Sequence, residues 1–255
     1  MEINLLTVLQ EEMAMKLKGG LYHQTQIKLT YNSNRIEGSR LSEDQTRYIF
    51  ETNTINAPSD ETTNVDDIIE AVNHFACFDY MLKTAAEKLT EDMIKEYHRI
   101  LKTGTSDARK DWFSVGGYKT RVNVVGDSKT TAPSRVAAEM EKLISSYYAK
   151  EFITLEDIVE FHYEFESIHP FQDGNGRVGR IIMFKECLAH NVLPFIIDHK
   201  HKLFYYRGLK EFPNERGHLM DTCRSSQDAF EKMVTYFFPN VERVEGENDL
   251  GMELQ

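Results

Sequence analysis

The spacing of hydrophobic residues predicts a chain built mainly from helices. Between Asn64 and Leu89, hydrophobic residues recur at intervals of three and four and form one stripe on a helix: Val65, Ile68, Ile69, Val72, Phe75 and Ala76. Thr90 is a candidate N-cap for a second helix, which we expect to end at Gly104.

Further helices are expected along the rest of the chain. Pro133 suits the first position of one helix, and Thr154 suits the N-cap of another that continues to His169. Helical spacing resumes over residues 175–190, 204–211 and 218–238. The fold class we predict is therefore all-α.

One stretch breaks the helical pattern. Over residues 116–133, β-branched residues flank a Gly-Asp-Ser turn signal that begins at Gly126. This pattern predicts a single β-hairpin. A lone hairpin is marginally stable in water, so we expect it to lean on the helices and to act as a flap over a site.

The chain shows no internal repeat and no linker. We expect a catalytic domain over residues 63–240, preceded by a helical extension over residues 1–62. Residues 241–255 are acidic and lack periodicity, so we expect a disordered tail.

Composition narrows the classes of partner. The net charge of −11 and the pI near 5.3 argue against a general nucleic-acid binder. The three cysteines, Cys77, Cys187 and Cys223, match no disulfide or zinc spacing. No membrane-spanning run and no basic leader are apparent, so we expect a cytoplasmic protein that binds no membrane.

The segment HPFQDGNGRVGR at residues 169–180 concentrates the candidate chemistry. Gly174 and Gly176 allow backbone N–H groups to approach a ligand, and the following helix adds partial positive charge at its N-terminus. Arg177 and Arg180 lie three residues apart, so both can bind phosphate oxygens on one side of that helix. The sequence therefore predicts a polyphosphate site.

Two further residues of the segment suit catalysis. The Asp173 carboxylate is the type of ligand that Mg²⁺ prefers, and His169 titrates near neutrality and suits a general base. A calcium loop does not fit, because Arg177 and Phe184 fall at positions that need oxygen ligands. A Walker A loop does not fit residues 126–130 either. An ordinary helix-capping loop explains the glycines but not His, Asp and two Arg together.

With these residues in place, the segment resembles the signature of the Fic family, His-x-Phe-x-Asp/Glu-Gly-Asn-Gly-Arg-x-x-Arg, at every fixed position. The resemblance implies a Fic-type helical bundle that transfers AMP from ATP to a Ser, Thr or Tyr hydroxyl. It implies His169 as the base, Asp173 as the magnesium ligand, and Gly174, Asn175, Gly176, Arg177 and Arg180 as phosphate-binding residues.

The resemblance extends to two other segments. Residues 116–133 look like the family's flap, which pairs with a target segment and closes over the nucleotide through Val124, Val125 and Gly126. Tyr205, Tyr206 and Asn214 resemble residues that line the adenosine pocket, although the spacing to Asn214 is looser here. Without the family, the two tyrosines are simply packing residues.

A further similarity lies near the N-terminus. Ser33, Glu37 and Gly38 fit the family's inhibitory Ser/Thr-x-x-x-Glu-Gly/Asn helix, expected at about residues 21–38. This implies that Glu37 pairs with Arg180 and blocks productive ATP binding. Read without the family, Asn34 and Glu37 could begin a helix as a capping box, or Gly38 could end one.

Three functions stay open on the sequence. The first is protein AMPylation, with self-modification and a homodimer as further expectations. The second is removal of AMP, with Glu37 orienting a water molecule. The third is a catalytically silent nucleotide-binding module, which the complete His169, Asp173 and Arg180 set argues against. Phosphate or phosphocholine transfer is disfavoured because the Gly-Asn-Gly-Arg stretch is intact.

Overall fold

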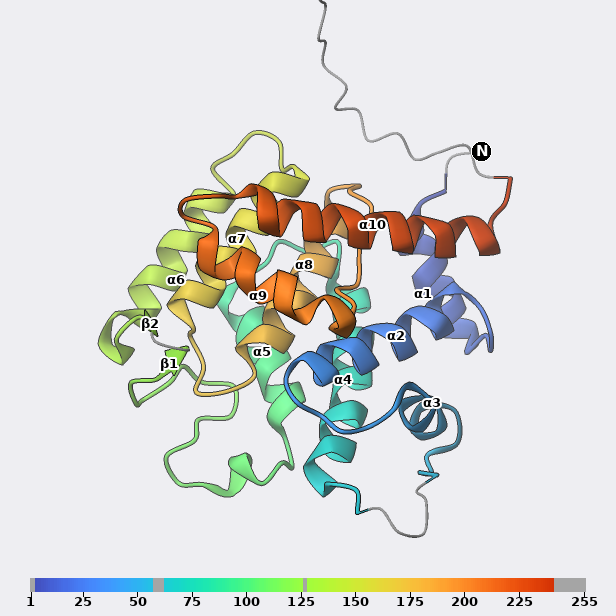
Figure 1. The fold of residues 1–255 in the computed structure, drawn as a ribbon, viewed down its shortest axis with the longest axis horizontal. Coiled ribbons are helices and arrows are strands. Elements are labelled where there is room, and N and C mark those ends of the chain that lie inside the picture. The colour runs from blue at the N-terminus through green and yellow to red at the C-terminus, as the bar shows by residue number, and fades with distance from the viewer. Residues whose placement is uncertain (1–2, 57–61, 126–127, 241–255) are drawn as a thin grey trace, which may run out of the picture.

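The structure, a computed structural model, describes residues 3–56, 62–125 and 128–240. Its regular elements are helices and two very short strands (Figure 1). The helices are α1 (Leu5–Met15), α2 (Leu21–Ile36), α3 (Glu43–Thr52), α4 (Val65–Thr84), α5 (Glu91–Lys102), α6 (Pro133–Tyr147), α7 (Leu155–Ile168), α8 (Asn175–Ala189), α9 (Lys202–Glu211) and α10 (Gly217–Phe237). Two 3₁₀ turns, η1 (Asp107–Arg109) and η2 (His199–His201), join them.

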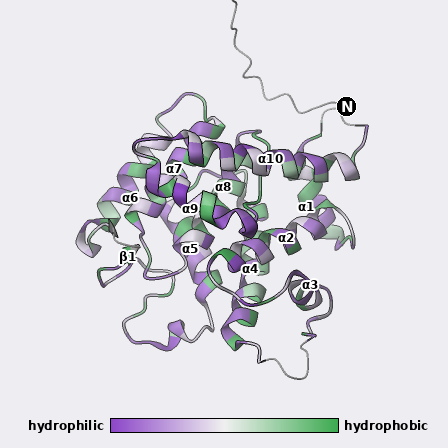
Figure 2. Cartoon of the chain, viewed as in Figure 1, coloured by the Kyte–Doolittle hydropathy of each residue, from purple (hydrophilic) through white to green (hydrophobic). Residues whose placement is uncertain are grey.

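Helix α8 lies near the centre of the bundle and contacts α1, α2, α4, α5 and α7 (Figure 1). Of its 15 residues, 13 are buried, which is the pattern of a helix enclosed on all sides. In contrast, most of the surrounding helices in Figure 2 carry both hydrophobic and hydrophilic residues, as amphipathic helices around a shared core do. The N-terminus of α8 is therefore held rigidly by its neighbours.

The hydrophobic core joins the N-terminal helices to the rest of the bundle. One cluster contains Leu9 and Leu29 of the first two helices together with Phe78 of α4 and Phe184 of α8. The rings of Phe78 and Phe184 meet edge to face at 5.4 Å. Residues on both sides of position 62 thus share one core.

Side-chain caps fix where several helices begin. Thr90 accepts a hydrogen bond from the Met93 backbone at the start of α5. Thr154 forms a capping box with Asp157 at the start of α7, and Ser42 forms another with Gln45 at the start of α3. Pro133 takes the first turn of α6. The caps expected at Thr90, Pro133 and Thr154 are confirmed.

The helical fold class is confirmed, but several details differ from expectation. Helices α1 and α3 were not expected as separate elements. The capping-box start at Asn34 is wrong, because α2 has already run from Leu21 and ends at Ile36. Gly38 instead follows the helix end with φ +107°, a conformation that favours glycine.

The expected hairpin is much shorter than residues 116–133. Strand β1 (Val124–Val125) pairs antiparallel with β2 (Ser128–Lys129), Val124 opposite Lys129. The predicted turn at Gly126 and the predicted tail at residues 241–255 lie outside the described residues. None of the helices in the described ranges is both long and apolar enough to span a bilayer.

Candidate active site

His169 lies at the junction between α7 and the loop that precedes α8. It caps α7 in the left-handed conformation, with φ 52°, and its backbone N–H donates to the Phe165 carbonyl at 2.9 Å. This conformation is uncommon for a residue with a side chain and turns the chain sharply out of the helix. The imidazole is only 18% exposed, at the edge of the site.

Asn175 closes the loop rather than facing outward. Its side-chain oxygen accepts from the Phe171 N–H at 2.8 Å, and its amide donates to the Phe171 carbonyl at 2.9 Å. The Phe171 ring stacks on His98 of α5, with centroids 4.0 Å apart and planes 3° apart. Asn175 and Phe171 therefore set the shape of the loop, and α5 supports it from behind.

His98 also fixes the backbone of Asp173. Its Nδ1 accepts from the Gly116 N–H at 3.0 Å, so the ring hydrogen of the neutral form sits on Nε2 and donates to the Asp173 carbonyl at 3.2 Å. Burial lowers the pKa of His98 to about 3, and nearby Lys102 acts in the same direction. The neutral His98 ring thus connects the segment at Gly116 to the loop by two hydrogen bonds.

Because Gly174 and Gly176 have no side chains, the backbone at the start of α8 is left uncovered at these two positions. Gly174 is the N-cap with φ 82°, and a Cβ there would lie 3.6 Å from both His98 and Lys102. At Gly176 a Cβ would lie 2.3 Å from Glu37 Oε1 and 2.9 Å from an Arg180 nitrogen. The Glu37 carboxylate therefore lies against the backbone of the first turn of α8, where the sequence predicts phosphates.

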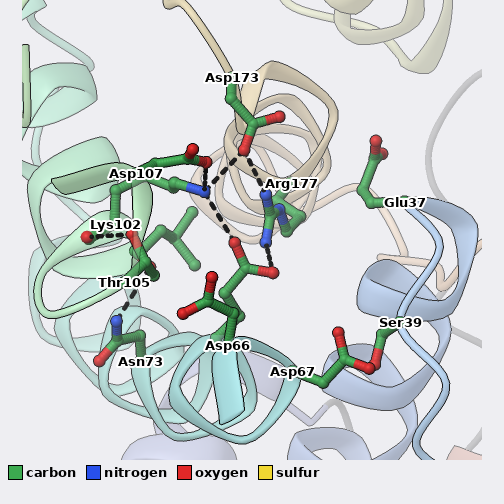
Figure 3. Close-up of polar contacts among 12 residues, drawn as sticks. Glu37, Ser39, Asp66, Asp67, Asn73, Lys102, Thr105, Asp107, Asp173 and Arg177 are labelled. Carbon is green, nitrogen blue, oxygen red and sulfur yellow. Dashed lines mark hydrogen bonds and ion pairs between the residues drawn. The ribbon is translucent and has the colours of Figure 1, made fainter. Parts of the chain in front are cut away.

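Asp173 belongs to a dense charge cluster (Figure 3). Its Oδ2 lies 2.6 Å from Lys102 Nζ and 3.1 Å from Arg177, and Glu70 of α4 binds both cations, at 2.7 Å and 2.6 Å. Burial alone would raise the pKa of Asp173, but the charges of Arg177 and Lys102 outweigh it and hold that pKa well below its usual range. Asp173 is still 48% exposed, so an ionised carboxylate is presented to solvent.

Arg180 is bound by the end of α2. Its Nε donates to Ser33 Oγ at 3.0 Å, and one terminal nitrogen donates to the Ser33 carbonyl at 3.0 Å and to Glu37 Oε1 at 2.6 Å. Arg180 is 4% exposed and Glu37 is 29% exposed at the side chain. In Figure 3, Glu37 lies across the N-terminal end of α8 from Lys102. The second terminal nitrogen of Arg180 is buried without a hydrogen-bond partner.

Helix α9 holds the C-terminus of α2 from outside. Lys202 and the Tyr206 hydroxyl both donate to the Ile36 carbonyl, next to Glu37, and Tyr206 does so at 3.3 Å. Tyr206 is 40% exposed, whereas Tyr205 is 1% exposed and its hydroxyl lies 2.6 Å from His162 Nε2. The two rings contact each other, with centroids 5.5 Å apart, but only Tyr206 has a ring open to a ligand.

Two further residues predicted to bind the nucleotide, Asn214 and Val124, are exposed. Asn214 is exposed in the turn after α9, where its N–H donates to the Glu211 carbonyl at 2.9 Å. Val124 is 61% exposed on β1. The nucleotide-binding roles of Asn214, Val124 and Val125 stay predictions.

Sequence reasoning missed Glu166, which lies beside His169. Its Oε2 is 3.9 Å from His169 Nδ1, and its Oε1 is buried without a partner. Burial, with Glu37 acting in the same direction, raises the pKa of Glu166 to about 8. The motif marks its second-last residue, Gly179, as variable, yet a Cβ there would lie 2.9 Å from Glu166 Oε1 and 2.7 Å from the His162 ring.

Lys102 and Glu70, which bind Asp173 and Arg177, were hard to predict from the sequence. They lie on separate helices and come together only because α4 and α5 pack side by side. One sign was available: Lys102 lies four residues after His98, on the helix face expected to be buried, and an enclosed lysine is costly unless its charge is paired. His169 also departs from expectation, since burial and the charge of Lys119 lower its pKa to about 4.

Comparison with known proteins relates part of the chain to a protein family. Residues 88–187 match the Fic/DOC family. A protein adenylyltransferase Fic from Nematostella vectensis is 29% identical over 197 residues, covering 74% of this chain and 42% of that protein. Its counterpart from Drosophila willistoni is 26% identical over 213 residues, covering 81% and 40%. The chain thus spans about two fifths of the length of these relatives.

Solved structures show the same fold. A Fic domain-containing signaling protein from Bacteroides thetaiotaomicron superposes with a TM-score of 0.74 at 21% identity, covering 95% of this chain and 98% of that one. A Fic-1 fragment from Caenorhabditis elegans gives 0.68 at 20% identity, covering 90% and 69%. The solved structures show the shared fold, and the matched segment together with the named relatives identifies residues 88–187 as a domain of the Fic/DOC family.

Proposed function

We propose that this chain is a protein adenylyltransferase, which transfers AMP from ATP to a Ser, Thr or Tyr hydroxyl of a target protein. The observation that carries the proposal is the convergence of His169, Asp173 and Arg180 on the bare N-terminus of one buried helix. The names of the relatives support the same activity.

The nucleotide phosphates fit the first turn of α8. Its unpaired N–H groups and helix dipole favour anions, and the missing side chain at Gly176 leaves room for them. Arg180 would bind a terminal phosphate once Glu37 moves away. Arg177 already binds Glu70 and Asp173, so its first task is to hold Asp173 in place. Tyr206, Asn214 and residues 124–126 would enclose the adenosine.

Asp173 fits a magnesium ion. The carboxylate is held ionised by Lys102 and Arg177, and it is partly exposed beside the proposed phosphates. Within the described residues, no group of three His, Cys, Asp or Glu side chains forms a metal cage, which suits an ion completed by phosphates and water. When bound, such an ion would neutralise phosphate charge.

His169 would act as the general base. Its lowered pKa leaves the imidazole uncharged at neutral pH and able to accept a proton. It takes the proton of the target hydroxyl while that oxygen attacks the α-phosphorus, and pyrophosphate leaves. The target segment would pair with the hairpin at residues 116–133, and self-modification and a homodimer belong to the same proposal, as does a cytoplasmic location.

Glu37 would inhibit this reaction in the resting protein. Its carboxylate lies 2.6 Å from Arg180 and against Gly176, so it takes the guanidinium and the space that the phosphates need. Its negative charge also opposes phosphate binding. Ser33, Glu37 and Gly38 would thus form an inhibitory device at the end of α2.

The test is Glu37→Gly, with labelling by ATP that carries radioactive phosphorus at the α position. We expect labelling of the protein itself and of lysate proteins to rise at least severalfold, because Arg180 is freed. Equal labelling before and after the substitution would contradict inhibition by Glu37.

The matched control is the double variant Glu37→Gly with His169→Ala. Its labelling should fall to background, because no base remains for the hydroxyl. If the double variant labelled as strongly as Glu37→Gly, the role of His169 would be wrong. If no variant labelled anything, the silent nucleotide-binding module would be favoured.

Removal of AMP is the second candidate. The Glu37 carboxylate, 29% exposed beside the phosphate site, is placed to orient a water molecule. Incubating an AMP-modified target with the wild-type protein and magnesium, with no pyrophosphate added, separates the two directions. Only the second activity, which hydrolyses the bond between AMP and the target, then releases free AMP.

A further inference from the structure

Lys119 is a buried lysine between the hairpin and the loop that carries His169. It is 3% exposed, and its ammonium has three acceptors: Asn123 Oδ1 at 2.7 Å, Thr130 Oγ1 at 2.7 Å and the Ile168 carbonyl at 3.3 Å. Three N–H donors thus meet three acceptors, all of them uncharged. Burial lowers the pKa of Lys119 to about 8, so the side chain is still mostly charged at neutral pH.

These acceptors join three separate parts of the site. Asn123 directly precedes β1, Thr130 directly follows β2, and Ile168 is the last residue of α7 before His169. Thr130 also donates to the Asn123 side chain at 2.5 Å. One ammonium therefore binds both ends of the hairpin and the helix end that orients His169.

The backbone around Lys119 follows the catalytic loop. The Lys119 N–H donates to the Pro170 carbonyl at 2.8 Å, and the Asn123 amide donates to the Phe171 carbonyl at 3.1 Å. Between them, the Arg121 N–H donates to Gln172 at 3.3 Å. Residues 119–123 thus lie along residues 170–172, and a displacement of one segment is passed to the other.

The charge of Lys119 also acts on His169. After burial, it is the strongest influence that lowers the pKa of the imidazole. Glu37, Asp173 and the Glu166 backbone carbonyl face the same ring and act in the opposite direction. A buried cation without a carboxylate partner is costly, and such groups are found where a site needs them.

We propose that Lys119 is a positioning residue of the AMP-transfer site, which fixes the hairpin to the loop of His169 and places a positive charge next to that loop. This inference rests on the proposed function. The Lys119 ammonium donates to three acceptors of the protein itself, so we assign it no contact with the nucleotide or the reacting oxygen. It acts through the placement of His169 and of the hairpin on which the target lies.

The test uses three substitutions in the Glu37→Gly protein. Lys119→Met removes the charge and the hydrogen bonds, Lys119→Gln keeps two N–H donors without the charge, and Lys119→Arg keeps the charge. Each variant is first checked for an unchanged circular dichroism spectrum. The readouts are kcat and KM for ATP and for a target, the pH profile of kcat, and an NMR titration of His169.

We expect kcat of Lys119→Met to fall by about 10²-fold, as displaced catalytic groups commonly do, with KM for ATP unchanged. The NMR titration should show a higher pKa of His169 in the Met and Gln variants, and the acid limb of kcat should move to higher pH. Lys119→Arg should restore the original pKa of His169 and most of kcat. A purely structural lysine would shift none of these pH properties.

The results distinguish a failure of the Lys119 role from a failure of the AMP-transfer function. If Lys119→Met and Lys119→Gln leave kcat and the His169 titration as in the Glu37→Gly protein, the role of Lys119 is wrong while the proposed function stands. If Glu37→Gly itself transfers no AMP, the proposed function fails. The NMR titration then still decides whether Lys119 controls the charge of His169.

Discussion

At the scale of single residues, the ionisation and the availability of each charged side chain in the site depend on its partners. Asp173 is ionised because Lys102 and Arg177 bind it, and Arg180 is occupied because Ser33 and Glu37 bind it. Glu166 differs from these two: it lies beside His169, and its Oε1 is buried without a hydrogen-bond partner. Groups of this kind make stability depend on pH.

Glu166→Gln tests that dependence. Because the folded-state pKa of Glu166 is raised to about 8, the folded protein holds this proton more tightly than the unfolded chain. The contribution of this raised pKa to the free energy of unfolding is fully present below the pKa that Glu166 has in the unfolded chain. It is lost as the pH rises toward 8. We therefore expect Glu166→Gln to gain in Tm over wild type as the pH increases from 5 to 8.

Each kcal/mol corresponds to about 2–4 °C in a chain of this size, so the gain should reach several degrees. Thermal melts of both proteins at pH 5, 6, 7 and 8 measure it. Glu164→Gln, on an exposed face of the same helix, is the control and should show a smaller dependence. A Tm difference between Glu166→Gln and wild type that stays constant with pH would contradict a raised pKa.

At the scale of elements, the sequence predicted what local patterns determine. The buried stripe of α5, the caps at Thr90 and Thr154 and the Pro133 start all lie within short windows, so periodicity and capping were enough. The same applies to the loop between α7 and α8 and to the start of α8 at Asn175, because both depend on local sequence; the phosphate-binding role of this loop stays a proposal. The stripe predicted for α4 is wrong, since only Phe75 of it is buried: Val65 and Val72 are 66% and 42% exposed, because the helix turns another face to the core. The hydrophobic residues of that face are Ala71, Phe75, Cys77, Phe78, Met81 and Leu82.

Contacts between elements could not be predicted in this way. Lys102 and Glu70 meet across two helices, and Lys119 joins segments that are about 49 residues apart in the chain. Helix α3 is short, with only Thr46 and Ile49 buried, so its stripe is weak. The hairpin pairs over fewer residues than its β-branched pattern indicated, because residues 119–123 bond to the catalytic loop instead.

The close approach of α7 to α8 yields a prediction at this scale. A Cβ at Gly179 would crowd the buried His162 ring, whereas a Cβ at Gly176 meets the ends of the Glu37 and Arg180 side chains. We expect Gly179→Ala to lower the free energy of unfolding by about 1–3 kcal/mol. Gly176→Ala, its matched control, should cost less because Glu37 can turn into solvent.

Urea denaturation of the two variants and wild type measures both costs. The m-values should agree, so that midpoints can be compared directly. Equal destabilisation by the two substitutions would show that the space beside Gly179 is not as tight as its neighbours indicate.

At the scale of the whole molecule, the N-terminal helices share a core with the rest of the bundle. Leu9, Leu29 and Ile36 are buried in the same cluster as Phe78 and Phe184. The boundary between an extension over residues 1–62 and a catalytic domain over residues 63–240 stays a prediction from the sequence. The shared core does not mark this boundary. Removing residues 1–62 would expose this core, so Glu37→Gly is the cleaner way to study inhibition.

A shared core predicts one cooperative unfolding transition. Far-ultraviolet circular dichroism reports on all helices, and Trp112, the one tryptophan of the chain, reports locally on the segment between α5 and α6. We expect the two signals to give the same midpoint in urea, within experimental error. Two separated transitions would show that the N-terminal helices and the Fic domain unfold independently.

The position of Glu37 also bears on how quickly the protein could respond to a regulator. Glu37 follows the last residue of a helix whose own side chains are locked in the core, and Lys202 and Tyr206 hold the preceding carbonyl. Breaking the Glu37–Arg180 ion pair then requires only rotation of one partly exposed side chain, not detachment of a helix, and the hydrogen bonds from Arg180 to Ser33 can stay in place. Such rotations take nanoseconds or less at exposed sites, so the lifetime of the ion pair, rather than helix unfolding, would set the response time.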